Sequence, residues 1–159
     1  MKEALFPKIA DNNYKGHKLT KWILYFYIFK SFFAGCVHMF AADGGAQSIG
    51  SIALDTFTKG GADSFITMFA MWGMEQLVIG LIAVVILWRY KSLIPMLWGI
   101  YAIEYIGRGI VPLIKPGLVT AHTPPGAAAD FVLIPIAIVM FLFALFSSKK
   151  YTGKSQNEK

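Results

Sequence analysis

Four long apolar blocks limit what this chain can fold into. They cover residues 22–41, 65–88, 93–114 and 129–148 of a 159-residue sequence. A helix needs roughly 20 consecutive apolar residues to cross the hydrocarbon core of a bilayer. In water each of these blocks would have to be buried, and the rest of the chain is too short to cover them all. The blocks therefore predict an all-α integral membrane protein, with four transmembrane helices forming one bundle in a single membrane domain.

The composition agrees with this prediction. Hydrophobic residues make up 56% of the chain and charged residues only 15%, whereas soluble domains carry about 25% charged residues. The net charge of +6 would suit nucleic acid, but Lys and Arg cluster beside the apolar blocks and no basic–aromatic motif is present, so no nucleic-acid partner is expected. The single cysteine, Cys36, excludes an intrachain disulfide and a cysteine zinc site.

The positions of Lys and Arg predict the orientation in the membrane. The N-terminal segment, the short link after the second block and the C-terminal tail together hold eleven of them, whereas the other two connections hold only Lys59 and Lys115. Positive loops stay on the cytoplasmic side, so both termini are predicted to be cytoplasmic. The first eighteen residues lack the apolar core of a signal peptide, and the first block is expected to be retained as a span.

Two connections are expected on the outer side. In the first, residues 42–64, four apolar residues recur at helical spacing and predict a short interfacial or re-entrant helix. The second, which begins at Lys115, is rich in turn residues and is expected to be irregular. Pro95 suits a first helical turn, while Pro112 and Pro135 fall inside their spans. The apolar residues of the first connection are Ile49, Ile52, Ala53 and Phe57.

Four charged residues fall inside the apolar blocks at similar depth. Lys30 lies in the first block, Glu75 in the second, and Glu104 and Arg108 in the third. An ionised side chain at the bilayer centre costs about 2.5–3.5 kcal/mol, so these groups are expected to pair and to face inward. Glu104 and Arg108 lie one helical turn apart and predict one ion pair. Lys30 is expected to find Glu75 or Glu104 across the bundle.

Two interpretations of this cluster stay open. In the first, the charges hold the helices together, or Arg108 extends toward the interface. In the second, they form a ligand or proton site, because ionisable groups inside a membrane are functional candidates. Arg108 would then offer its free donors to a polar headgroup, a quinone oxygen or a small anion. Trp72, Gln76, Tyr101 and Tyr105 would line such a site.

A second polar group is expected nearer the outer surface. His38 lies close to the outer end of the first span, and Asp130 opens the fourth span on the same side. Together with Asp43 and His122 they are candidates for an outward-facing vestibule. A metal or a bis-histidine haem needs several converging ligands, and His17 lies on the opposite side, so no metal is predicted. No firmly bound cofactor is predicted either, and a quinone or a lipid is the candidate bound molecule.

Three features resemble the DoxX-like superfamily of small four-span membrane proteins. They are a first outer loop bearing Gly and Asp, the stretch "GMEQLVIGL" in the second span, and "YIGRGIVPLIKPG" at the end of the third. In the last of these, the pair Gly107–Arg108 is followed by a Pro-Gly turn. The resemblance implies the four-helix architecture and a role for Arg108. Some members are accessory subunits of quinone-linked sulfur oxidation, and no catalytic residue is carried over.

These observations give one functional hypothesis and two alternatives. The chain is expected to be a polytopic protein of a bacterial-type inner (plasma) membrane, acting as an accessory or interaction subunit with a membrane-protein partner or a second copy. It would alternatively be a small transporter or binding protein for a lipid, quinone or small anion. The remaining alternative is a membrane enzyme on a lipophilic substrate, with Glu75 and Glu104 as acid and base. No phosphate loop, nucleophile elbow or HExxH motif supports an enzyme.

Overall fold

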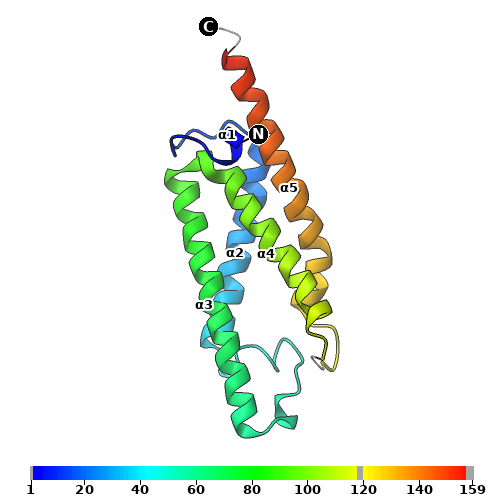
Figure 1. Cartoon of the computed structure of the whole chain (residues 1–159). Coiled ribbons are helices and arrows are strands. Elements are labelled where there is room, and N and C mark those ends of the chain that lie inside the picture. Colours follow the sequence, from blue (N-terminus) through cyan, green and yellow to red (C-terminus); the bar gives the residue numbers. More distant parts are fainter. Residues whose placement is uncertain (1, 118–119, 157–159) are drawn as a thin grey trace.

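Long helices dominate the computed structural model, which describes residues 2–117 and 120–156 (Figure 1). In this part of the chain, four helices are long and apolar enough to cross a membrane, and no strand is present. The prediction of an all-α chain with four such helices is confirmed. In chain order the elements are α1 (Lys2–Leu5), α2 (Lys18–Phe40), the 3-10 turn η1 (Leu54–Thr56), α3 (Lys59–Arg89), the 3-10 turn η2 (Lys91–Leu93), α4 (Ile94–Ile114) and α5 (Pro125–Gln156).

Helices α2 and α3 begin before their apolar blocks because polar residues form their first turns. Nδ1 of His17 accepts a hydrogen bond from the backbone N–H of Leu19 and starts α2. The Thr58 side chain accepts from the N–H of Gly61 and starts α3 six residues before the predicted span. Such caps satisfy N–H groups that have no partner inside the helix. Pro95 lies in the first turn of α4, as predicted.

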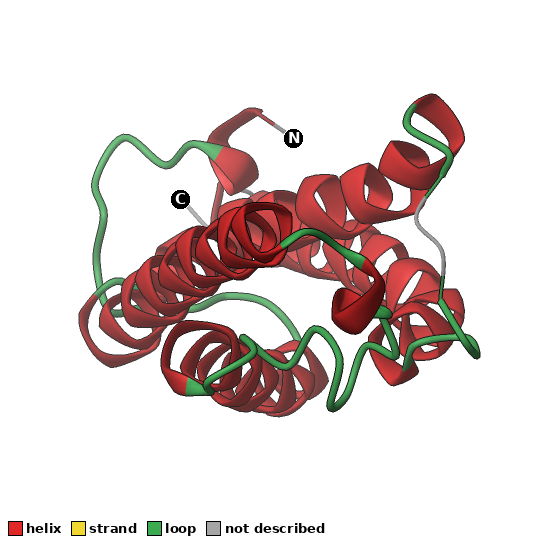
Figure 2. Ribbon diagram, turned by 90° about the horizontal axis from the view of Figure 1, so that it is seen from below, coloured by secondary structure: helices red, strands yellow, loops and turns green. Residues whose placement is uncertain are grey.

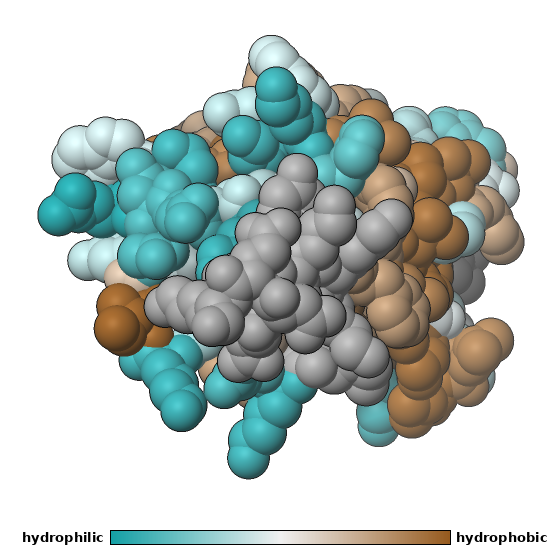
Figure 3. Space-filling model, turned by 90° about the horizontal axis from the view of Figure 1, so that it is seen from above, coloured by the Kyte–Doolittle hydropathy of each residue, from teal (hydrophilic) through white to brown (hydrophobic). Residues whose placement is uncertain are grey.

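Consecutive long helices run in opposite directions, so both ends of the chain lie at the same end of the molecule (Figure 1). Viewed from the end opposite the termini, the helices are seen roughly down their axes, and loops connect them (Figure 2). In the view onto the end with the termini, hydrophilic residues gather on one part of the surface and a flank of hydrophobic residues lies beside them (Figure 3). The arrangement matches an even number of passes through one layer.

Helices α2 and α3 approach closely because glycines face each other between them. A Cβ atom on Gly35 would lie 2.8 Å from Cγ of Leu77 and 2.9 Å from the carbonyl oxygen of Gly73. A Cβ on Gly73 would in turn lie 2.8 Å from the carbonyl oxygen of Gly35. Small residues at such a contact let two backbones come together, a common device between helices in membranes.

An aromatic core joins α2 to the α4–α5 side of the molecule. The ring of Tyr27 on α2 makes edge-to-face contacts with Trp98, Tyr101 and Tyr105 on α4, with centroids 5.1–5.4 Å apart. Aromatic pairs favour this geometry. The Tyr27 hydroxyl donates to the carbonyl oxygen of Leu133 on α5 at 2.6 Å, so one buried side chain connects three helices.

The first outer loop differs from its prediction. Instead of a helix through Ile49 and Phe57, residues 41–50 form successive turns and only η1 is helical. Asp43 explains the turns, because its carboxylate accepts from the N–H groups of Gly45 and Ser48 at 2.9 and 2.6 Å. Ser51 has a φ of 52°, which interrupts any helix across this stretch.

The two outer loops touch. An isolated antiparallel bridge pairs Ile52 with Thr120. The N–H of Ala121 donates to the carbonyl of Ser51 at 3.0 Å, and the Ser51 hydroxyl donates to the carbonyl of His122 at 2.8 Å. The second loop was expected to be irregular, and its described residues contain no helix or named strand before α5. The contact joins the α2–α3 connection to the α4–α5 connection at one end of the molecule.

Candidate functional site

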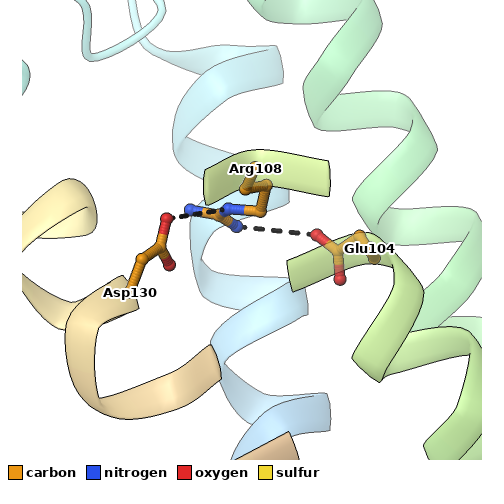
Figure 4. A network of polar contacts seen from close by, with 3 residues as sticks. All are labelled: Glu104, Arg108 and Asp130. Atoms are coloured by element: carbon orange, nitrogen blue, oxygen red, sulfur yellow. Dashed lines mark hydrogen bonds and ion pairs between the residues drawn. The ribbon is translucent and has the colours of Figure 1, made fainter. Parts of the chain in front are cut away.

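Arg108 is the centre of an ion-pair network between α4 and α5 (Figure 4). Its Nε donates to Oδ2 of Asp130 at 3.1 Å. Its Nη1 lies 3.5 Å from Oε1 of Glu104, one turn earlier on α4. The three side chains are only 13–15% exposed. The predicted Glu104–Arg108 pair is present, and Asp130 adds a second carboxylate from another helix.

Two aromatic rings flank the same guanidinium. Its central carbon lies 5.3 Å from the ring centroid of Trp72 on α3 and 5.1 Å from that of Tyr105 on α4. A cation over an aromatic face is attracted by the ring quadrupole, and the attraction strengthens where water is excluded. Arg108 therefore contacts three helices. Two aromatic residues that the sequence put forward as lining residues, Trp72 and Tyr105, do surround it.

Lys30 takes a different partner from the one expected. Its ammonium lies 4.9 Å from the ring centroid of Tyr105, and none of the ion pairs between described residues includes it. Lys30 was expected to reach Glu75 or Glu104 directly or through water, and the described residues show no direct ion pair with either. Lys30 is within electrostatic range of Asp130, Glu104 and Arg108. It shares the Tyr105 ring with Arg108, so the network holds two cations and two carboxylates and its formal charges cancel.

Glu75 stands outside this network. Its side chain is exposed on α3, and no ion pair of the described residues includes it. Glu104 lies within electrostatic range of Glu75. The next residue, Gln76, is 3% exposed, and its Nε2 atom has no hydrogen-bond partner. Glu75 was expected to turn inward, whereas its side chain is exposed on α3.

The residues predicted to form an outer vestibule do not share one site in the described structure. Nδ1 of His38 lies 2.8 Å from the carbonyl oxygen of Gly44, and its ring stacks on Trp72 with centroids 4.7 Å apart. Asp43 uses its carboxylate to hold its own loop. The side chain of His122 is exposed, and Asp130 turns inward to Arg108. His38 is nevertheless linked to the network, because His38 and Arg108 both contact the Trp72 ring.

Two pockets of the described structure lie away from Arg108. One, of about 570 Å³, is an apolar groove between α2 and α5. The other, of about 230 Å³, lies between the N-terminal segment, Ser92 and Ser148. No residue of the Arg108 network lines either pocket. Among the described residues, no group of three or more His, Cys, Asp or Glu side chains converges as a metal site.

The arrangement is suited to holding helices in place. A guanidinium offers five N–H donors, and here two carboxylates from separate helices and two aromatic faces surround it. A free anion would have to compete with both carboxylates for the same cation. The Asp130 pairing was missed from the sequence because Asp130 sits at the edge of its apolar block. The signal in the sequence was Pro125, because proline is favoured in the first turn of a helix, and a helix that starts there has Asp130 in its second turn.

Comparison with known proteins gives no match to a family model, to a curated protein or to a solved structure.

Proposed function

We propose that the chain is a multi-pass protein of a bacterial-type inner (plasma) membrane, with α2, α3, α4 and α5 as its spans and both termini in the cytoplasm. The length and apolar character of the four helices support this. Exposed apolar side chains also support it, because Leu113 and Phe131 are each 80% exposed. Soluble proteins seldom leave such large apolar surfaces in water. The excess of Lys and Arg at the end with both termini supports the orientation.

Within that membrane, the protein acts as an accessory or interaction subunit. The Arg108 network fixes the relative positions of α3, α4 and α5, and the exposed side of α3 receives a partner helix. We extend the proposal to membership of the DoxX-like superfamily, which the four-helix architecture and the Gly107–Arg108 motif support. The small-anion alternative has less support, because Glu104 and Asp130 already occupy the guanidinium of Arg108. The acid–base alternative is weakened by the same pairing of Glu104.

The observation that carries this proposal is the exposed carboxylate of Glu75. Along the helix axis it lies about 24 Å from Lys59 and about 21 Å from Arg89, close to the middle of α3. An unpaired charge at that depth costs about 2.5–3.5 kcal/mol. A partner helix with a Lys, an Arg or a side-chain amide at the same depth would remove that cost. The surrounding surface is apolar, and Met71 and Val78 on α3 are exposed beside Glu75.

Native electrophoresis of gently solubilised host membranes tests the partner. The wild-type protein should migrate in an assembly larger than its monomer. Glu75→Lys should release the monomer, because it places a cation against the cation or donor of the partner. Met71→Leu, on the same face of α3, is the matched control and should leave the assembly intact. A monomeric wild type, or an assembly that survives Glu75→Lys, would falsify the proposal.

Two copies of the chain with different tags identify the kind of partner. Co-purification of both tags would assign the Glu75 surface to a homo-oligomer in which two glutamates share protons. Recovery of one tag only, in an assembly that Glu75→Lys disrupts, would assign it to a different membrane protein.

A further inference from the structure

The groove between α2 and α5 lies between two contacts that join these helices. Trp22 and Phe26 line one wall, and Pro135, Val139 and Met140 line the other. Toward the middle of the helices, the Tyr27 hydroxyl bonds to the Leu133 carbonyl. Toward the end of α2 nearest the N-terminus, the backbone N–H of His17 donates to the Ser147 hydroxyl at 3.2 Å. The His17 and Phe143 rings also make contact there, with centroids 5.2 Å apart.

The volume of the groove suits a single acyl chain better than a helix. From His17 to Tyr27, α2 rises about 15 Å, which equals half of the roughly 30 Å hydrocarbon core. A helix with its side chains is about 10–12 Å wide, so 15 Å of it would fill on the order of 1,200 Å³. The groove holds about 570 Å³. It is therefore too small to enclose a partner helix.

The end of the groove nearest the termini carries positive charge. Lys18, Trp22 and Phe26 follow one another at intervals of four residues, so they share a face of α2. Lys18 is exposed and Lys21 is half-buried, one turn or less beyond Trp22. Tryptophan at this level is typical of the interface between headgroups and acyl chains. Lysines beyond it lie where a lipid phosphate would lie.

We infer that the α2–α5 groove binds a phospholipid with an anionic headgroup from the cytoplasmic leaflet. One acyl chain lies against Trp22, Phe26 and Val139, and the phosphate is held by Lys18 and Lys21. The inference rests on the proposed membrane insertion and is independent of the proposed partner at Glu75. The groove and the Glu75 surface lie on different helix faces, so each can be altered alone.

Native mass spectrometry of the purified full-length protein, released from nanodiscs of mixed phosphatidylglycerol and phosphatidylcholine, tests this site. The wild type should retain bound lipid and should prefer phosphatidylglycerol to phosphatidylcholine by about fivefold for each lysine that contributes. Val139→Trp fills the groove and should remove most of the retained lipid. Val132→Trp makes the same change on α5 at a residue that does not line the groove and should retain it. Lys18→Gln with Lys21→Gln should retain lipid but lose the preference, whereas Lys59→Gln should keep it.

Each contrary result overturns the inference. Equal lipid retention in Val139→Trp and wild type would exclude the groove. A phosphatidylglycerol preference that persists without Lys18 and Lys21 would exclude the headgroup contact. Displacement of lipid by an added hydrophobic peptide would assign the groove to a protein segment. Alkaline extraction of membranes tests membrane insertion separately. Release of the wild-type protein from the membrane would overturn both proposals. A protein that stays in the membrane but binds no lipid would overturn the lipid site alone.

Discussion

Nε of Arg108 on α4 donates to Oδ2 of Asp130 on α5 at 3.1 Å, in a site where both side chains are about 85% buried. Hydrogen bonds between ionised groups are roughly twice as strong as neutral ones. The second link of Arg108, to Glu104, stays within α4 and is longer, at 3.5 Å. Asp130 is thus the carboxylate that ties the two helices together.

Asp130→Asn should therefore destabilise the protein. The amide oxygen can still accept one hydrogen bond, but the charge that balances Arg108 is lost. The expected loss is about 1–3 kcal/mol of unfolding free energy, measured as a lower melting temperature by tryptophan fluorescence in detergent. Asp55→Asn, at an exposed residue of the first outer loop, is the control and should melt as the wild type does. An unchanged melting temperature for Asp130→Asn would show that the pair contributes nothing to stability.

Gly35→Ala should push α2 and α3 apart. The new methyl group would lie 2.8 Å from Cγ of Leu77 and 2.9 Å from the backbone oxygen of Gly73, and overpacking of this kind costs about 1–3 kcal/mol. Gly107→Ala is the matched control, because nothing lies within 4 Å of a Cβ there and alanine favours a helix. Thermal melting should fall for the first variant and stay equal or rise for the second. A stable Gly35→Ala protein would contradict the close approach of the two helices.

The first outer loop should loosen in acid. Burial acts to raise the pKa of the Asp43 carboxyl, but hydrogen bonds from Ser48 and Gly45 outweigh it and hold that pKa below its ordinary value. A carboxylate with a lowered pKa stabilises the folded loop fully above its unfolded pKa, about 4, and loses this effect as the pH falls through the folded pKa.

Amide hydrogen exchange within residues 43–50 measures this effect. Protection should persist from pH 7 to about 5 and fall below about pH 4, after correction for the intrinsic exchange rate. In Asp43→Asn, protection should be lower throughout and independent of pH. A wild-type loop with the same protection at pH 3 and pH 6 would show that the carboxylate does not hold the turns.

Both termini should be cytoplasmic. The N-terminal segment, the link after α3 and the C-terminal tail hold eleven Lys and Arg residues in the sequence, against two in the outer loops, and positive segments resist translocation. A fluorescent reporter that matures only in the cytoplasm should be active when fused after Lys159. A periplasmic phosphatase fused at the same place should be inactive, and the reverse pattern would invert the orientation.

The sequence by itself determined the helices. The four apolar blocks placed α4 to within one residue at its start, and the other helices differ mainly where polar residues such as Thr58 extend their ends. Length and apolar composition are local properties, so they can be read without knowing the fold. The same holds for the Glu104–Arg108 pair, which follows from helical spacing along one helix.

Only the tertiary structure decided which residues meet across helices. Lys30 lies over Tyr105 instead of pairing with Glu75, and Asp130 reaches Arg108 instead of the outer surface. A helix that is apolar on nearly every side does not reveal from its sequence which face is turned inward. That rotation is set by contacts such as Gly35 against Gly73 and Tyr27 against the α4 aromatics. These contacts join residues far apart in the chain, and they exist only once the helices have packed.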